Sequence, residues 1–542
     1  MSSISVRYRL SAKEKENNEL LQHFLKTQQS RNFASVITLT SHLGIVAITA
    51  VATYLPSPVY AANLTFVPGD LVVSRSVYEG TADTVTVGQT LPGGGQAIAN
   101  GDYPNVFNNA TPDPSFGITS PIFLDQITTS GTKVDTLPID PRVVTTSFSS
   151  KSELSLNLTA DNTGLTFMGY ATGINQLDVS NSNTPGIIEP GNPVTTTPTY
   201  REVAQVNYDG SLQTTTTNAY SGNNGRAAIL AANGEYYTVG NAGNGNGSPA
   251  ITAGTGVQIV TPGQNATAQT PGTNPVGQFN ITQYGYPADK TAKDNNFRGE
   301  TIFNNTLYVT KGSGSNGINT VYQVGNAGTL PNPANAANTP ITILPGFPTA
   351  LAKGPANSIN HPFGIWFANS NTVYVADEGD GVIADAANST SAGLEKWSLV
   401  GSTWQEDYVL QNGLNLGVPY SVAGLDPNLN PATDGLRDLT GKINSDGTVT
   451  LFAVTSTVSN SGDQGADPNE LVAISDTLSN TTAAQAADEQ FSVIDRANYA
   501  EVLRGVSFAP QATTVPEPSE VAGIIGAALG MCVLLRRRSS WG

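Results

Sequence analysis

Cysteine is almost missing from this chain of 542 residues. The single cysteine, Cys532, lies close to the C-terminus. The rest of the chain can therefore form no disulfide, no thiolate nucleophile and no cysteine metal site, whatever the redox state of its compartment.

Histidine is nearly as scarce, and His23, His42 and His361 are the only three. Only His361 lies in the long central part of the chain. A Ser-His-Asp triad, a two-histidine zinc motif or a histidine-rich copper site would have to depend on that one residue. This scarcity makes a binding protein a stronger expectation than an enzyme.

Basic residues are also few, with 25 Lys and Arg against 42 Asp and Glu and a formal net charge of −17. Nine of the basic residues lie in the two terminal segments, so residues 62–515 are more acidic still. A surface of this sign repels phosphate backbones, so we expect no binding of nucleic acid. It is compatible with divalent cations and with solubility in a polysaccharide matrix.

The C-terminus has three parts in a fixed order. A short motif is followed by an apolar run over residues 521–535, which is shorter than the ~20 residues of a membrane-spanning helix. A basic stop, Arg536, Arg537 and Arg538, comes next. The motif consists of Val515, Pro516, Glu517, Pro518 and Ser519.

This order resembles the PEP-CTERM sorting signal of Gram-negative bacteria. The resemblance implies an exosortase-type processing enzyme as partner, transient membrane contact through the tail, and a link to exopolysaccharide or biofilm. An ordinary C-terminal membrane anchor is the alternative, because basic residues can also hold a permanent span in place.

The N-terminus has the order of a secretory signal peptide with a long basic front. An apolar run over residues 33–55 precedes small residues that end at Ala61. An uncleaved anchor is the alternative. With both signals in place, we expect export to the cell surface, the outer membrane or the extracellular matrix. The predicted divisions are a signal peptide at 1–61, a propeller at 62–511 and a sorting tail at 512–542.

Helical periodicity is almost absent after residue 62. Short runs of β-branched and aromatic residues alternate with Gly, Asn and Pro turns, which is typical of an all-β protein with long loops. About 450 residues without a charged or proline-rich linker favour one large unit built from repeats.

Five segments of this region share the order strand, turn, strand, polar loop, strand. Blades of a β-propeller have this rhythm. The starts lie about 60 to 75 residues apart, against roughly 40 to 45 in a compact blade, so we expect long loop insertions on a rigid scaffold. The five segments begin near Ser152, Gly225, Phe297, His361 and Leu436.

The segment at residues 362–397 resembles an NHL-type propeller repeat, since Pro-x-Gly-Ile is followed by Val-Tyr-Val-Ala-Asp and a further strand. The other segments match this motif only loosely. A sixth blade is expected to combine residues 503–508 with strands at 70–77 and 122–127, because pairing the two ends removes a free edge and closes the ring. The prediction is therefore a propeller of six blades, or seven if one repeat is hidden.

Several repeats carry a basic residue at the same position, close to the start of the first predicted strand. The first strand of a propeller blade lines the central channel, so these residues are expected to form a ring at one channel mouth. One interpretation is a site for an anion or acidic sugar, because guanidinium groups suit carboxylates and phosphates. The other is structural pairing with an acid or carbonyl of a neighbouring blade. The ring residues are Arg226, Arg298, His361, Arg437 and Arg504, with Lys151 in the corresponding place of the first repeat.

A second candidate site is acidic. Asp377, Glu378 and Asp380 follow a predicted strand, and oxygen ligands in such a loop suit Ca²⁺. The spacing is not that of an EF-hand, so the signal is weak and a solvated loop is the alternative. Ca²⁺ is the only cofactor that the sequence suggests.

Three interpretations of the function follow. The first is an exported β-propeller that binds a polysaccharide or a surface protein and catalyses nothing. The alternative is a Ca²⁺-assisted propeller hydrolase or lyase, similar to lactonases, phytases or glycosidases, that acts on an anionic substrate. A structural stalk or adhesin is a third interpretation.

Overall fold

A computed structural model describes most of the chain between residues 64 and 513. The chain divides after Ala61 into two compact units, and every described residue belongs to the second. The predicted signal peptide, the sorting motif at 515–519 and the basic stop at 536–538 lie outside the described residues. The described ranges are 64–79, 85–90, 96–104, 117–148, 150, 153–188, 197–242, 249–263, 274–277, 279, 285, 294–312, 316–352, 360–460 and 465–513.

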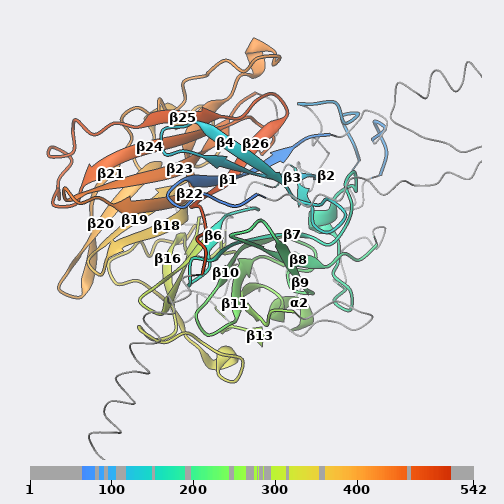
Figure 1. The fold of residues 1–542 in the computed structure, drawn as a ribbon, viewed down its shortest axis with the longest axis horizontal. Coiled ribbons are helices and arrows are strands. Elements are labelled where there is room, and N and C mark those ends of the chain that lie inside the picture. Colours follow the sequence, from blue (N-terminus) through green and yellow to red (C-terminus); the bar gives the residue numbers. More distant parts are fainter. Residues whose placement is uncertain are drawn as a thin grey trace, which may run out of the picture. The chain divides into compact units, whose positions relative to one another are not determined.

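Six antiparallel sheets of four strands form the body (Figure 1). The first blade contains β6 (Asn157–Leu158), β7 (Gly164–Tyr170), β8 (Arg201–Asn207) and β9 (Leu212–Thr217). The second contains β10 (Gly225–Leu230), β11 (Tyr236–Gly240), β12 (Gly256–Val260) and β13 (Asn274–Pro275). The third contains β14 (Glu300–Phe303), β15 (Thr306–Lys311), β16 (Thr320–Val324) and β17 (Ile341–Ile343).

The fourth blade contains β18 (Pro362–Asn369), β19 (Thr372–Asp377), β20 (Gly393–Val400) and β21 (Thr403–Leu410). The fifth contains β22 (Ala432–Ile443), β23 (Thr448–Val458), β24 (Glu470–Thr477) and β25 (Ser492–Arg496). The sixth contains β26 (Glu501–Phe508), β1 (Leu71–Val77), β3 (Ile122–Ile127) and β4 (Lys133–Pro138).

Smaller elements decorate these sheets. β2 (Thr119–Ser120) and β5 (Thr146–Ser147) form a two-stranded ribbon, and α2 (Pro249–Ala253) is a short helix. Four 3-10 turns lie in connections: η2 (Val179–Asn181), η4 (Ala336–Asn338), η5 (Ala386–Asn388) and η6 (Pro427–Leu429). No helix among the described residues is long and apolar enough to span a membrane.

The predicted all-β propeller is confirmed, and it has six blades. Each of the five sequence repeats forms one blade, and the expected strands from the two ends form the sixth. The hairpins also follow the sequence: Gly234 and Gly447, at the turns of the second and fifth blades, adopt φ of 81° and 86°. Glycine reaches this left-handed region without the steric cost of a Cβ.

The hydrophobic core is divided among the contacts between blades. Six main clusters each combine residues of two consecutive blades, and together they run once around the ring. The cluster of Val72, Leu124, Leu165 and Phe167, for example, joins the sixth blade to the first. Strand side chains alternate between two faces, so a blade with apolar residues on both faces can pack against both neighbours.

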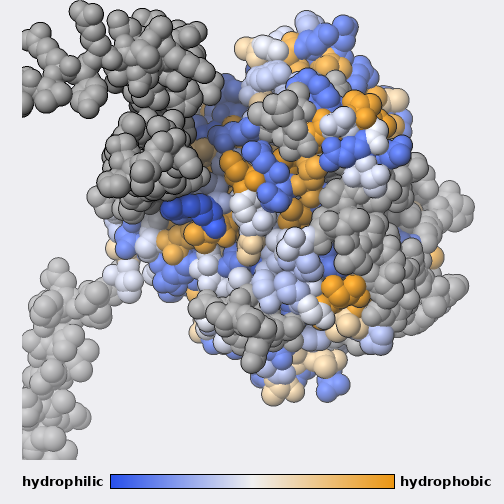
Figure 2. Space-filling view, turned by 90° about the vertical axis from the view of Figure 1, so that its right-hand side faces the viewer, coloured by the Kyte–Doolittle hydropathy of each residue, from blue (hydrophilic) through white to orange (hydrophobic). Residues whose placement is uncertain are grey.

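The surface of the described residues is mixed. Exposed large apolar residues come from separate places, including Val87, Val400, Val418 and Ile443. In the view of Figure 2, hydrophobic residues form small groups between hydrophilic ones. Single exposed apolar residues of this kind are ordinary on soluble domains.

The ring closes through β1 and β26, which come from opposite ends of the chain and lie side by side (Figure 1). Their antiparallel register runs from Leu71 opposite Phe508 to Val77 opposite Glu501. Arg75 reinforces this pairing, because its guanidinium binds Asp125 of β3 and Glu501 of β26 at 2.6 Å each.

Close backbone packing at the closure gives a first prediction. A Cβ built on Gly505 of β26 would lie 2.3 Å from the carbonyl oxygen of Leu154 and 2.6 Å from the amide nitrogen of Leu156. We expect Gly505→Ala to lower the free energy of unfolding by about 2 kcal/mol or more, because backbone cannot yield as a flexible side chain does. The matched control is Gly173→Ala, since no atom lies within 4 Å of that Cβ position. Chemical denaturation measures both, and equal stability of the two variants would contradict the expected clash.

Candidate functional site

One end of the propeller carries most of the long connections. The innermost strands β6, β10, β14, β18, β22 and β26 all begin at this end. The connections 378–392 and 411–431 also lie there, because they join second to third strands or one blade to the next. The first hairpins of the blades, such as 231–235 and 444–447, lie at the opposite end. We call the two ends the loop end and the hairpin end.

The predicted cations lie at the loop end. Arg226 is the second residue of β10, Arg298 precedes β14, and His361 directly precedes β18. Arg437 and Arg504 lie within the first halves of β22 and β26. Lys151 lies outside the described residues. The arginines are largely buried: only 4% of Arg226, 5% of Arg437 and 3% of Arg504 is exposed.

Two of the arginines share one carboxylate. Glu378, directly after β19, lies 3.8 Å from Nη2 of Arg298 through Oε1 and accepts a hydrogen bond of 3.1 Å from Nε of Arg437 through Oε2. The three residues come from the third, fourth and fifth blades. Glu378 therefore joins three blades at the loop end.

A third arginine lies next to this group. Nη1 of Arg226 donates to the side-chain oxygen of Asn296 and, at 2.7 Å, to the carbonyl oxygen of Phe297. Burial, followed by the positive charge of Arg298, lowers the pKa of Arg226 well below its ordinary value. Burial also lowers the pKa of Arg298, with a smaller contribution from Arg437. We call Arg226, Arg298 and Arg437, with Glu378, the arginine cluster.

The other two predicted ring residues have different surroundings. Arg504 donates to the carbonyl oxygen of Phe148 and, at 2.8 Å, to that of Gly465. The backbone N–H of His361 donates to the carboxylate of Asp377 at 2.5 Å. All four arginines thus contact other blades or connecting loops, as the structural interpretation expects. That these four arginines bind an anion stays a prediction.

The three acids predicted to bind Ca²⁺ have separate partners. Asp377 accepts from the backbone N–H groups of His361 and Gly379, while Glu378 binds arginines. Asp380 accepts from the backbone N–H of Val382, 2.8 Å away. Among the described residues, no group of three or more His, Cys, Asp or Glu side chains could hold a metal ion. The predicted Ca²⁺ site therefore lacks a converging set of ligands.

Two buried acids of this region were missed by the sequence reasoning. Glu395 accepts hydrogen bonds from Trp397 and Asn360, and burial, with the charge of Asp377, raises its pKa well above the ordinary value. Asp434 accepts from the backbone N–H of Gly381 at 2.8 Å. The only signal for Asp434 was its place in the repeat, shortly before Arg437. Glu395 had none, because the sequence does not show which face of β20 is covered.

Comparisons with known proteins give only distant likenesses. No family model and no curated protein matches the chain. Among solved structures, the parainfluenza virus 5 hemagglutinin-neuraminidase ectodomain has a TM-score of 0.33 at 10% identity, covering 65% of this chain and 74% of its own. The N-terminal domain of Nup159 has a TM-score of 0.27 at 7% identity, covering 80% and 86%. Likenesses this weak carry no argument about function.

Buried acids make stability depend on pH. Burial raises the pKa of Asp434 to about 7, that of Glu202 to about 7 and that of Asp438 to about 6. The folded state therefore holds more protons than the unfolded state between the ordinary carboxyl pKa and about pH 7. These groups contribute most to the free energy of unfolding below the ordinary carboxyl pKa. Their contribution is lost as the pH rises from there through about pH 7. We expect the melting temperature to fall between about pH 5 and about pH 8.

Variants identify which carboxyl groups cause this dependence of the melting temperature on pH. Asp434→Asn cannot ionise, so its melting temperature should depend less on pH over this interval. The control is Asp446→Asn, because Asp446 is exposed and hydrogen bonds from Thr448 lower its pKa. Calorimetry across the interval measures both slopes. A melting temperature that rises with pH would show that ionised carboxylates stabilise the fold instead.

Proposed function

We propose that this protein is an exported, surface- or matrix-associated β-propeller that binds a carboxylate-bearing polymer, such as an acidic polysaccharide, at the loop end and catalyses nothing. The observation that carries the proposal is the arginine cluster. Three buried guanidinium groups from three blades lie close together, and Glu378 is the carboxylate shared by two of them.

Three guanidinium groups lie beside one shared carboxylate, with the charge of Glu153 also acting on Arg226, and this arrangement favours an anionic ligand. Burial and the charge of Arg298 lower the pKa of Arg226, and burial and the charge of Arg437 lower the pKa of Arg298. An added carboxylate would therefore stabilise both charged forms. The planar guanidinium group can bind a carboxylate through two parallel hydrogen bonds. The rest of the chain is acidic, so this local positive site would select where on the surface an acidic polymer can bind.

The positions of the two ends of the described propeller suit display from a surface. The first residue of β1, Leu71, pairs with the last residue of β26, Phe508, at the hairpin end. The backbone N–H of Gln511 then donates to the carbonyl oxygen of Asn162, in the first hairpin of the first blade. A C-terminal sorting tail that follows would start from the hairpin end. The arginine cluster would then face away from the membrane.

A hydrolase is the second candidate, and Asp377 is the observation that favours it. Burial raises the pKa of Asp377 to about 6, with the opposing charge of His361 lowering it and that of Glu378 adding to it. A carboxyl group that titrates this close to neutral pH can serve as a general acid or base. Release of shorter products from an acidic polymer would favour this candidate over simple binding.

Binding measurements test the leading proposal. Calorimetry with oligouronates and with neutral glucans of the same length should show binding only to the acidic series, weakened by salt. Arg298→Gln should weaken it at least tenfold, about 1.4 kcal/mol. Arg142→Gln is the control, because that exposed arginine pairs with Asp140 outside the cluster. Equal binding of neutral and acidic series would overturn the proposal.

Glu378→Gln separates binding from a structural role. Removing the negative charge that Arg298 and Arg437 share should tighten binding of oligouronates, while the fold loses an ion pair. If the cluster only joins blades, the variant will lose stability without any gain in affinity. Thermal unfolding and calorimetry on the same sample distinguish these results.

A further inference from the structure

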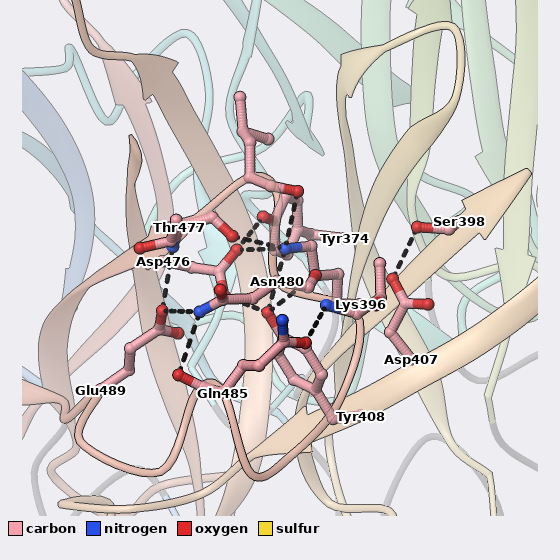
Figure 3. A network of polar contacts seen from close by, with 12 residues as sticks. Tyr374, Lys396, Ser398, Asp407, Tyr408, Asp476, Thr477, Asn480, Gln485 and Glu489 are labelled. Atoms are coloured by element: carbon pink, nitrogen blue, oxygen red, sulfur yellow. Dashed lines mark hydrogen bonds and ion pairs between the residues drawn. The ribbon is translucent and has the colours of Figure 1, made fainter. Parts of the chain in front are cut away.

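A second group of buried charges lies between the fourth and fifth blades, away from the arginine cluster. Nζ of Lys396, on β20, lies 2.8 Å from Oδ2 of Asp476, on β24, and both side chains are 0% exposed (Figure 3). The two residues belong to different blades. A bond between them would therefore link neighbouring blades of the ring.

Two tyrosines fix the position of the carboxyl group. The hydroxyl of Tyr408 donates to Oδ1 of Asp476 at 2.5 Å, and that of Tyr374 donates to Oδ2. Nζ of Lys396 also donates to the carbonyl oxygen of Thr477 at 2.9 Å. These contacts hold the nitrogen beside the carboxyl group, and Cγ of Asp476 is one covalent bond beyond the oxygen that it contacts.

A third ionisable group completes the arrangement. Oε1 of Glu489 accepts from the backbone N–H of Thr477 at 2.9 Å and from Asn480 at 3.0 Å, as Figure 3 shows. Oε2 is buried and has no hydrogen-bond partner among the described residues. Burial, followed by the nearby carboxyl group of Asp476, raises the pKa of Glu489 to about 7. This carboxyl group can therefore hold or release a proton beside Asp476 near neutral pH.

We propose that Lys396 and Asp476 join in an intramolecular amide bond that covalently links the fourth blade to the fifth, with Glu489 as proton carrier. The inference is independent of the ligand proposed for the loop end. It rests on the distance, the complete burial and the placement of the third carboxyl group.

The reaction needs no oxidant and no cofactor. The ammonium of Lys396 gives one proton to the carboxylate of Asp476, which leaves a neutral amine and a neutral acid. The nitrogen lone pair attacks Cγ, and the carbonyl electrons move to the oxygen that the Tyr408 hydroxyl contacts. Glu489 protonates the departing hydroxyl, the C–O bond breaks, and Glu489 recovers a proton from the nitrogen. One ammonium and one carboxylate thus become one amide and one water.

Burial and proximity both favour this product. Two opposite charges in a site without water carry a desolvation cost of several kcal/mol per ion, which a neutral amide does not. Reactants held in place react as if at effective concentrations of about 10⁵ M or more. The reaction releases one water molecule, and both reacting side chains are fully buried.

Peptide mapping of the full-length protein tests the inference. After denaturation, trypsin should fail to cut at Lys396, because its amine is blocked. Residues 354–437 should appear joined to residues 443–496, as a branched peptide one water lighter than its two parts. Unlinked peptides 354–396 and 443–496 in full yield would overturn the proposal. The wild-type digest decides this by itself, so a variant that misfolds cannot obscure the result.

Two variants assign the roles. Lys396→Arg keeps the positive charge and the trypsin site but removes the nucleophilic amine, so peptide 443–496 should be recovered unlinked. Glu489→Gln keeps both reacting groups, and we expect at least a tenfold loss of the branched peptide. Full linkage in Glu489→Gln would overturn the role of Glu489 as proton carrier, and linkage in Lys396→Arg would overturn the assignment of the bond.

Discussion

The pairing of β26 with β1 is the constraint on which the rest of the ring depends. Each blade buries apolar side chains against two neighbours, so an open ring would leave the faces of the first and sixth blades exposed. Asp438, on β22, strengthens the closure from the fifth blade. It accepts hydrogen bonds from the backbone N–H of Val506 at 2.9 Å and from that of Leu156 at 3.0 Å. A single carboxylate thus connects the fifth, sixth and first blades.

Charge is sparse in this chain, at 12% of residues, and part of it is used inside the protein. Asp438 at the closure, Glu378 at the loop end and Lys396 between the fourth and fifth blades each connect separate blades. Apolar packing is non-directional, so it fixes a blade against its neighbour only loosely. Hydrogen-bonded charges have strict geometry, so these contacts add directional links between blades.

The sequence predicted the blades but not these contacts. Period-two runs and turn residues locate strands because both signals are local, and the pairing of residues 70–77 with 503–508 followed from the need to close a ring. The matching positions of Arg226, Arg298 and Arg437 at the starts of their repeats could also be predicted, because they too are a local feature of the sequence. Their convergence on Glu378 was not, because it depends on the path of a connection after β19. The pair Lys396 and Asp476 is separated by 80 residues and has no local signal.

The arginine cluster has a physical cost in addition to its role in joining blades. Well-packed apolar residues are often as stable as buried ion pairs or more so, and here three guanidinium groups lie close to one shared carboxylate. The ring already closes through β1 and β26 and through Asp438, so it does not need this cluster for its topology. Local conflicts with stability are expected where a protein performs its function. The loop end, which carries this group of buried charges, is therefore where we propose that an anionic partner binds.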